Sequence, residues 1–318
     1  MRFGLHAGTR GAAMDPGGLL AIARKAEDLG FTHFGLSDHV VIATDVNSPY
    51  PYTKSGKWFA HDSGECLDQL TALAFVAAGT STIRLLTSVM VLPHRPAVLT
   101  AKMLGTIDHL SRGRLTVGVG VGWMAEEIAV LGAPAFARRG KLADEYIEAF
   151  RALWTQTLPV YEGEFVNFSG VLFEPKPVQK PHPPIWVGGE TRPARRRAGR
   201  MGDGWYPVSN NPAAPYDSLA RFAAGLADMR SQAEAAGRDP AHIATGLITV
   251  GYRMGEADLL DDGIRRPFTG DAAAVLDDVG AFSEAGLDHM VIGFESDDLH
   301  RSLDTIEAFA TDIIGKMG

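Results

Sequence analysis

The sequence predicts an α/β fold in which residues 1–318 form a single (β/α)8 (TIM) barrel, and three observations lead to this prediction. Eight short β-rich runs alternate with longer helical patterns, as in parallel sheets with right-handed crossovers. A length of 318 residues suits one large barrel. The stretches "AEDLGFTHFGL" and "FSEAGLDHMVIGF" repeat one order of helix, glycine, apolar residue and strand. A doubly wound sheet is the main alternative, although it usually has fewer strands.

The expected strands and helices alternate along the whole chain. The strands are Arg2–His6, His33–Ser37, Ile83–Val89, Arg114–Val119, Ile185–Val187, Gly204–Pro207, Ile243–Tyr252 and His289–Phe294. The helices are expected at 17–29, 67–79, 96–110, 140–154, 192–200, 214–236, 271–285 and 300–314. Gly30 and Gly286 follow two of these helices, where a left-handed glycine commonly ends a helix.

Two connections are too long to be plain turns. The first spans about residues 40–66, follows the second strand and therefore lies at the end of the barrel where active sites form. Its aromatic residues are Tyr50, Tyr52, Trp58 and Phe59. The alternative is a surface excursion that packs on a partner subunit. The second connection, about residues 155–184, contains a hairpin-like stretch and a proline-rich run, and we expect it to be structural decoration.

Composition excludes several classes of function. The net charge of −8 argues against nucleic-acid binding, and no apolar stretch is long enough to span a membrane. A single cysteine, Cys66, and the absence of a signal-peptide pattern lead us to expect a cytoplasmic protein. No metal-binding motif is present, so we expect no metal; the alternative is a barrel hydrolase that gathers His6, Asp38 and His39 around one.

The second strand ends in "GLSDHVV", which places Asp38 and His39 at the barrel mouth. We interpret His39 as a proton donor or a polar contact to a bound ring, with Asp38 anchoring it. Adjacent strand residues face opposite sides, so at most one of the two points straight in unless the strand has ended. The alternative is a structural Asp–His pair that closes the following loop.

Two glycine-rich turns follow later strands. In "LTVGVGVGWMAEE" the glycines at 118, 120 and 122 do not have dinucleotide-binding spacing, but they permit a flat ligand to approach the backbone. In "PPIWVGGETRPARRRAGR", Gly188 and Gly189 precede a helix N-terminus and form a natural phosphate cradle. Tight turns without a ligand are the alternative. Arginines on one face of the following helix either hold an anionic tail or are simply solvated; they are Arg192, Arg196 and Arg200.

The third strand carries Thr87 and Ser88 inside the apolar run "LLTSVMVL". Small polar residues weaken a central strand, and they are tolerated where its end forms a bulge or polar contacts.

Four segments taken together resemble the luciferase-like superfamily of flavin and deazaflavin oxidoreductases over nearly the whole chain. They are "AEDLGFTHFGLSDH", "TSVMVLPHRPAVLTAKMLGTIDHLSRGRLTVGVGVGW", "FEPKPVQKPHPPIWVGGE" and "AGRMGDGW". The Asp38–His39 pair and "TSV" are most similar to the branch that uses the deazaflavin coenzyme F420. In that branch the peptide bond matching Ser88–Val89 is a non-proline cis bond whose bulge supports the central ring of the cofactor.

The resemblance implies a set of site residues. The cofactor-binding residues would be Asp38, His39, Thr87, Ser88, Val89, Gly120, Gly122, Gly188 and Gly189, with the last two at the phosphate end. Trp123 stands where a sugar-phosphate dehydrogenase of this family has its catalytic glutamate. That role is therefore disfavoured, and we expect Trp123 and Trp58 to line the substrate pocket.

The resemblance further implies an F420-dependent oxidoreductase that transfers hydride between C5 of the deazaflavin and a small organic substrate, with His39 as the catalytic proton donor or acceptor. One alternative is an FMN-dependent monooxygenase that works with a flavin reductase. Another is a non-catalytic flavin- or deazaflavin-binding protein. By analogy with the family we expect a homodimer.

Overall fold

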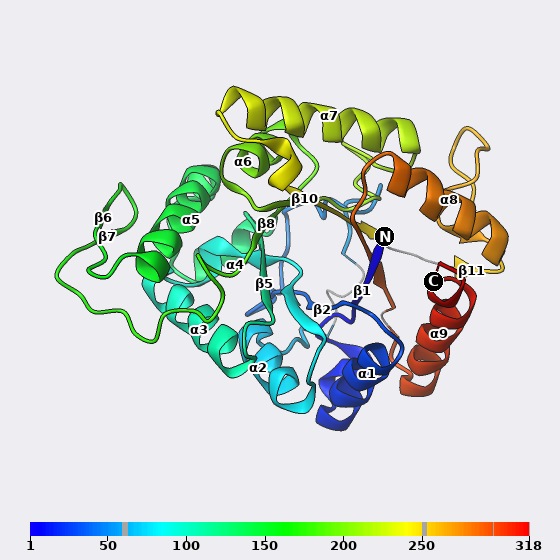
Figure 1. Ribbon diagram of the computed structural model, residues 1–318, viewed down its shortest axis with the longest axis horizontal. Helices are drawn as coiled ribbons and strands as arrows, with labels where there is room; N and C mark the ends of the chain where they lie inside the picture. The colour runs from blue at the N-terminus through cyan, green and yellow to red at the C-terminus, as the bar shows by residue number, and fades with distance from the viewer. Residues whose placement is uncertain (59–62, 250–252, 295, 318) are drawn as a thin grey trace.

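Eight parallel strands close into a barrel in the computed structural model, which describes residues 1–58, 63–249, 253–294 and 296–317 (Figure 1). They are β1 (Arg2–His6), β2 (His33–Leu36), β3 (Arg84–Thr87), β5 (Leu115–Gly120), β8 (Ile185–Gly188), β9 (Gly204–Tyr206), β10 (Ala244–Thr249) and β13 (His289–Gly293). Pairing of β3 with β5 and of β1 with β13 completes the ring. The predicted barrel is confirmed, strand by strand; residues 250–252, expected at the end of the seventh strand, lie outside the described residues.

The helices surround the barrel, as Figure 1 shows. The long ones are α1 (Pro16–Asp28), α2 (Gln69–Gly79), α3 (Ala97–Leu110), α5 (Arg139–Thr155), α6 (Arg192–Met201), α7 (Leu219–Ala235), α8 (Ala272–Glu284) and α9 (Leu299–Asp312). A short helix, α4 (Ala125–Val130), and a 3-10 turn, η2 (Leu92–His94), follow β5 and the two-residue strand β4 (Met90–Val91). Gly30 and Gly286 have the expected positive φ, at 85° and 103°.

One helix begins later than predicted. Residues 214–236 were expected to be helical, but α7 starts at Leu219, capped by the side chain of Ser218. The preceding turn instead buries Tyr216, whose hydroxyl donates to the backbone carbonyl of Glu190 at 3.1 Å. This tertiary contact draws the segment toward the barrel, and local sequence preference does not reveal it.

The interior of the barrel is filled by side chains. One buried cluster consists of Leu86, Trp186, Tyr206, Ile248 and Val291, which come from five different strands. A larger cluster packs between the strands and the helices. The barrel is thus a packed core, and ligand chemistry belongs at its ends.

The long connections lie outside the ring of strands. Residues 155–184 include the short antiparallel strands β6 (Tyr161–Glu162) and β7 (Asn167–Phe168), so the predicted hairpin is confirmed. This hairpin extends outward beyond α5 (Figure 1). A further small sheet, β11 (Arg253–Met254) with β12 (Thr269–Gly270), precedes α8 and was not anticipated. Among the described residues, no helix combines the length and the apolar character needed to cross a bilayer.

Candidate functional site

The predicted site residues gather at one end of the barrel. Because all eight strands run parallel, the segments after β2, β3, β5 and β8 meet at the carboxyl end, where barrel sites form. Residues 40–58 of the long loop also reach this end and contact the segments that follow β5. No group of three or more histidine, cysteine or acidic side chains with metal-binding geometry occurs within the described part of the chain.

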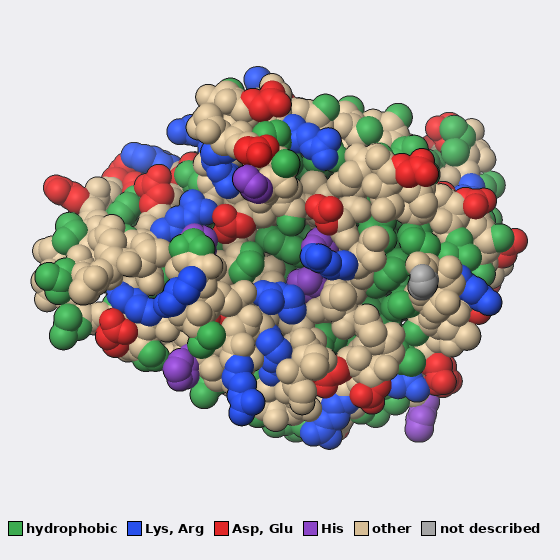
Figure 2. All heavy atoms as spheres, in the orientation of Figure 1, with side chains coloured by type: hydrophobic (Ala, Val, Ile, Leu, Met, Phe, Trp, Pro, Cys, Tyr) green, Lys and Arg blue, Asp and Glu red, His purple; other side chains and the backbone are tan. Residues whose placement is uncertain are grey.

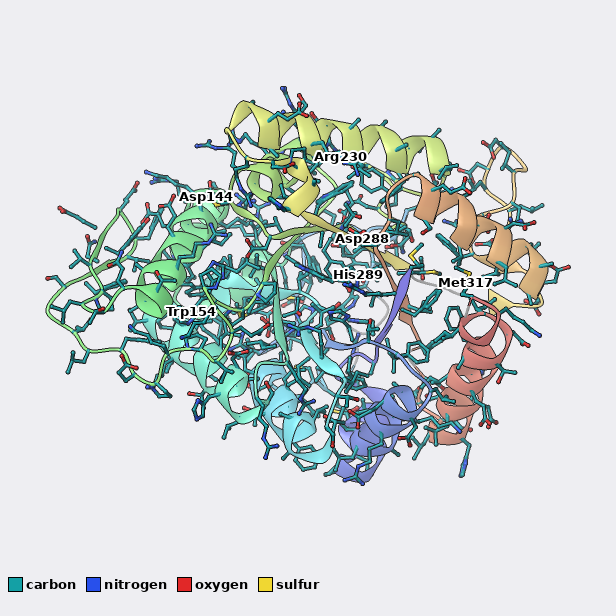
Figure 3. The ribbon with its side chains drawn as sticks, viewed as in Figure 1. Asp144, Trp154, Arg230, Asp288, His289 and Met317 are labelled. Carbon is teal, nitrogen blue, oxygen red and sulfur yellow. The ribbon has the colours of Figure 1, made fainter. Side chains whose placement is uncertain are left out.

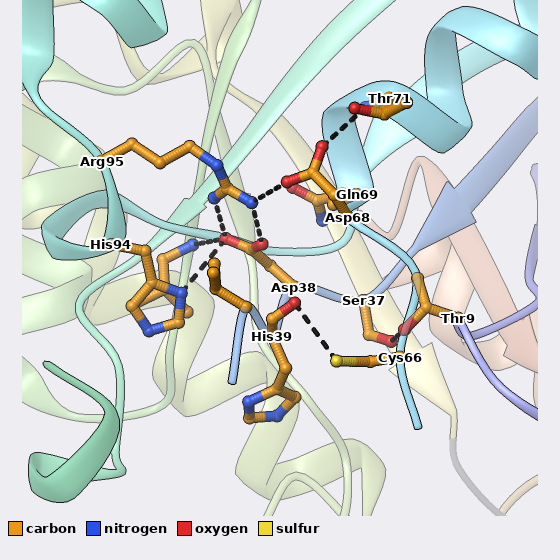
Figure 4. Close-up of polar contacts among 12 residues, drawn as sticks. Thr9, Ser37, Asp38, His39, Cys66, Asp68, Gln69, Thr71, His94 and Arg95 are labelled. Atoms are coloured by element: carbon orange, nitrogen blue, oxygen red, sulfur yellow. Dashed lines mark hydrogen bonds and ion pairs between the residues drawn. The ribbon is translucent and has the colours of Figure 1, made fainter. Parts of the chain in front are cut away.

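Asp38 and His39 point in opposite directions at the end of β2 (Figure 4). The Asp38 side chain is fully buried and accepts two hydrogen bonds from Arg95, at 2.9 Å each, and one from the Val91 backbone N–H at 2.9 Å. Burial alone would raise the pKa of Asp38, but the contacts with His94 and Arg95 outweigh it and lower the pKa to about 2. Asp38 therefore anchors this strand end as a carboxylate, and its direct contact with a cofactor stays a prediction.

His39 has a different carboxylate partner. Its Nδ1 lies 2.8 Å from Oε2 of Glu127, the third residue of α4, whose other oxygen accepts the backbone N–H groups of Val40 and Val41 at 2.7 and 3.2 Å. His94 lies 3.6 Å from the same Glu127 oxygen. Burial would raise the pKa of Glu127, but the hydrogen bond and charge of His39 outweigh it, so the pKa is lowered. Glu127 is thus an ionised acceptor beneath His39.

Aromatic rings pack against His39. Trp58 from the long loop lies 4.6 Å from the His39 ring, between ring centres, and Trp123 lies 6.3 Å from it. Tyr50 lies 5.1 Å from Trp123 and 5.3 Å from Tyr52. The structure therefore brings together Trp58 and Trp123, the two predicted pocket residues, although they are distant in sequence. The fourth aromatic residue of the loop, at position 59, lies outside the described residues.

The end of β3 has the bulge that the resemblance implied, with a cis peptide bond between Ser88 and Val89. The hydroxyl of Ser88 lies 3.0 Å from both His6 Nδ1 and the Tyr206 hydroxyl. The hydroxyl of Thr87 donates to a backbone carbonyl of β5 at 2.7 Å. Both small polar residues thus satisfy hydrogen bonds inside the barrel, which explains their place in an apolar strand.

Close contacts or backbone conformation explain why glycine occupies the four predicted positions. A Cβ at Gly120 would lie 2.8 Å from one methyl of Val89, and a Cβ at Gly188 would lie 2.9 Å from the other. Gly122 and Gly189 have φ angles of +81° and +114°, which favour glycine. Gly120 and Gly188 therefore make room for the bulge at Val89; contact of these glycines with a cofactor stays a prediction.

Sequence reasoning did not identify several residues that complete the site. Arg95, His94 and Glu127 hold Asp38 and His39. His94 and Arg95 are adjacent residues after β4 and Glu127 lies in α4, so both segments are far in sequence from positions 38 and 39. The only local signal was the acidic pair in "GWMAEE" directly after a glycine turn. Another missed residue is Glu190, which is buried after β8 and accepts hydrogen bonds from the loop after β9.

Comparison with known proteins assigns the chain to a family. A family model described as luciferase-like monooxygenase matches residues 1–258. The chain belongs to the luciferase-like monooxygenase family. This luciferase-like protein is 39% identical over 206 residues to an uncharacterized protein of Mycobacterium tuberculosis, covering 64% of this chain and 71% of that one.

Two further relatives are described by the cofactor they use. An FMNH2-dependent dimethylsulfone monooxygenase of Pseudomonas putida is 34% identical over 172 residues, which are 54% of the luciferase-like chain and 45% of the relative. An F420-dependent secondary alcohol dehydrogenase, solved with an F420–acetone adduct, shares the fold with a TM-score of 0.75 and 18% identity, covering 98% of each chain. Neighbours of this luciferase-like fold thus include both deazaflavin and flavin enzymes.

Proposed function

We propose that this protein is an F420-dependent oxidoreductase that moves hydride between C5 of the deazaflavin and a small organic substrate. The observation that carries the proposal is the placement of His39, which lies at the barrel mouth with one ring nitrogen held by Glu127 and its face against Trp58. A partly buried imidazole beside aromatic rings suits proton transfer in a site from which water is excluded.

The residues at the mouth fit a flat, mostly apolar ring with polar edges. Trp123 and Val89 are partly exposed and offer an aromatic surface and methyl groups, and the buried ring of Trp58 packs against Trp123 and His39. His39 offers a polar edge beside them. When bound there, the deazaflavin would supply a carbon that carries hydride and reacts poorly with oxygen.

The protein's own residues would do the remaining work. His39 would accept or donate the proton that accompanies hydride transfer, typically a contribution of about 10²–10⁴-fold in rate. Trp58 and Trp123 would keep water away from the reacting atoms. The buried pair of Asp38 and Arg95 would keep the end of β2 in position.

A flavin-dependent monooxygenase is the second candidate, and the 34% identity to an FMNH2-dependent enzyme favours it. Titration of the apoprotein with F420 and, separately, with FMN would decide between the two, because Trp58 and Trp123 would report binding by fluorescence quenching. We expect F420 to bind at micromolar concentration and at least tenfold more tightly than FMN. The reverse order would replace the proposal by the second candidate.

Turnover separates an enzyme from a non-catalytic binding protein. Reduced F420 would be mixed with an enone, a nitro compound and an imine in turn, and return of oxidised F420 would be followed by absorbance. We expect at least one class to be reduced by the wild-type protein. Tight F420 binding with no oxidation by any of the three would instead support a binding protein.

A further inference from the structure

Glu127 uses both carboxylate oxygens for two different tasks at the barrel mouth. Oε2 lies 2.8 Å from Nδ1 of His39, and Oε1 accepts the backbone N–H groups of Val40 and Val41. Its side chain is 1% exposed, so water does not compete for these contacts. One buried group therefore fixes both the histidine and the first residues of the long loop.

The proton on His39 follows from this geometry. An ionised carboxylate only accepts hydrogen bonds, so the Nδ1 of His39 must carry a hydrogen to bond with Glu127. In the neutral imidazole the other nitrogen, Nε2, then bears the lone pair. In that neutral form, Nε2 is the ring nitrogen of His39 that can accept a proton.

We propose, as an extension of the function proposed above, that Glu127 is a positioning residue that selects this tautomer of His39. This assignment replaces the interpretation of Asp38 as the residue that anchors His39. The Asp38 side chain points the other way and is held by Arg95. The carboxylate partner of His39 is Glu127, which lies 88 residues away in the sequence.

Glu127→Gln tests the proposal because the amide is asymmetric. The two backbone N–H groups of Val40 and Val41 would keep the amide oxygen on their side, which turns the amide NH2 toward Nδ1 of His39. Nδ1 must then accept, and the hydrogen moves to Nε2. The variant is therefore expected to invert the tautomer of His39 while keeping the shape of the side chain.

The neighbouring Glu126 provides a matched control. Its Oε1 accepts the backbone N–H groups of Asn47 and Ser48, at 2.9 and 3.1 Å, so it also holds the long loop. The carboxylate bonds to loop backbone instead of an imidazole. Glu126→Gln makes the same chemical change beside the same loop, its amide oxygen can keep the contacts with Asn47 and Ser48, and it is expected to leave the tautomer of His39 unchanged.

The experiment is long-range ¹H–¹⁵N NMR of apoprotein labelled at histidine, at mildly alkaline pH, with His39→Gln identifying the signals. Wild type and Glu126→Gln should show the Nδ1–H form of His39, and Glu127→Gln should show the Nε2–H form. An Nε2–H form in the wild type, or an unchanged Nδ1–H form in Glu127→Gln, would overturn the proposal. The wild-type spectrum of His39 tests the proposal even if Glu127→Gln does not fold.

Cofactor and activity measurements keep this proposal separate from the proposed function. With F420 bound, Glu127→Gln is expected to lower turnover by about 10²-fold to 10⁴-fold, because the wrong histidine tautomer in a Ser-His-Asp triad costs about 10⁴-fold. Its affinity for F420 should stay within about threefold of wild type. If wild type binds neither F420 nor FMN, the proposed function fails while the NMR result on Glu127 stands or falls by itself.

Discussion

Arg95 binds both carboxylate oxygens of Asp38, with Nη1–Oδ2 and Nη2–Oδ1 distances of 2.9 Å each. The pair joins the end of β2 to the segment that leads into α3. Nη2 of Arg95 also donates a hydrogen bond to Oδ2 of Asp68 at 2.6 Å. The Asp38 side chain is fully enclosed, so its charge depends on Arg95 for compensation. The strand end that presents His39 is therefore built on a buried ion pair.

Removing the guanidinium group of Arg95 should lower the stability of the folded protein. Arg95→Ala would leave the Asp38 carboxylate buried and unpaired, and we expect a loss of about 3–5 kcal/mol in the free energy of unfolding. Urea denaturation followed by circular dichroism would measure it. Arg95→Lys keeps the cation but loses the two-point contact, so its loss should be smaller. A loss below about 1 kcal/mol in Arg95→Ala would show that the pair is not compensating a buried charge.

His39→Ala should lower turnover far more than cofactor affinity. We expect turnover with reduced F420 to fall by about 10²–10⁴-fold, the usual range for a proton-transferring side chain. His39→Phe is the matched variant, because it keeps a ring against Trp58 without a nitrogen. Steady-state kinetics and fluorescence titration would be measured for both. Equal turnover in wild type and His39→Phe would remove His39 from the mechanism.

The packing of Val89 against two glycines gives a steric prediction. Gly120→Ala places a Cβ 2.8 Å from a Val89 methyl, and such overpacking typically costs about 1–3 kcal/mol. Thermal unfolding should show the loss, and adding Val89→Ala to the same protein should recover part of it.

The control lies in α8, where a Cβ at Gly280 would meet no described atom within 4 Å. Gly280→Ala should be neutral or stabilising by up to about 1 kcal/mol, because alanine favours helix. If Val89→Ala gives no recovery in the presence of Gly120→Ala, the glycine at position 120 is needed for a reason other than Val89.

Local signals were enough to predict the barrel. The strands are short β-rich runs, and Gly30 and Gly286 mark helix ends by their conformational freedom. Each signal lies within a few residues of the element that it predicts. The helix α4 was missed because six residues are too few to show a helical period.

The site was only partly predictable because its pairings are long-range. The spacing around His39 indicated a site but named Asp38 as the partner, since nothing local connects position 39 with Glu127. Likewise, the interpretation of Gly120 as space for a ligand did not anticipate that Val89 packs against this glycine, and contact of Gly120 with a ligand stays a prediction. Residue types at strand ends predict where chemistry occurs; the closed barrel decides which side chains meet there.

Two histidines at the other end of the barrel should make stability depend on pH. His33 and His289 come from the amino ends of their strands, are both 3% exposed and lie 5.1 Å apart between ring centres. Figure 3 shows His289 within the ring of strands, and Figure 2 shows basic and histidine side chains near the centre of the same face. Burial and the charge of Arg2 lower the pKa of His289 to about 4, and burial also lowers the pKa of His33.

The sign of the effect follows from which state binds protons. Below the ordinary histidine pKa of about 6.5, His289 binds a proton in the unfolded chain, whereas in the folded protein it binds one only near pH 4. The free energy of unfolding therefore falls as the pH drops from 6.5 to 4. At about 1.4 kcal/mol per pH unit, His289 alone accounts for a loss of about 3 kcal/mol between pH 6.5 and 4. Denaturant unfolding at several pH values would measure the slope.

His289→Gln separates this effect from acid titration elsewhere, because glutamine stays neutral throughout. Its stability should fall less steeply than that of the wild type between pH 6.5 and 4, whatever its stability at neutral pH. Carboxylates lose their contribution at lower pH: the pKa of Glu27 is also about 2, since hydrogen bonds from residues 81–83 outweigh burial, which would raise it. Below pH 4 the two proteins should therefore lose stability in parallel. Equal slopes above pH 4 would mean that His289 accepts a proton in the folded barrel at its ordinary pKa.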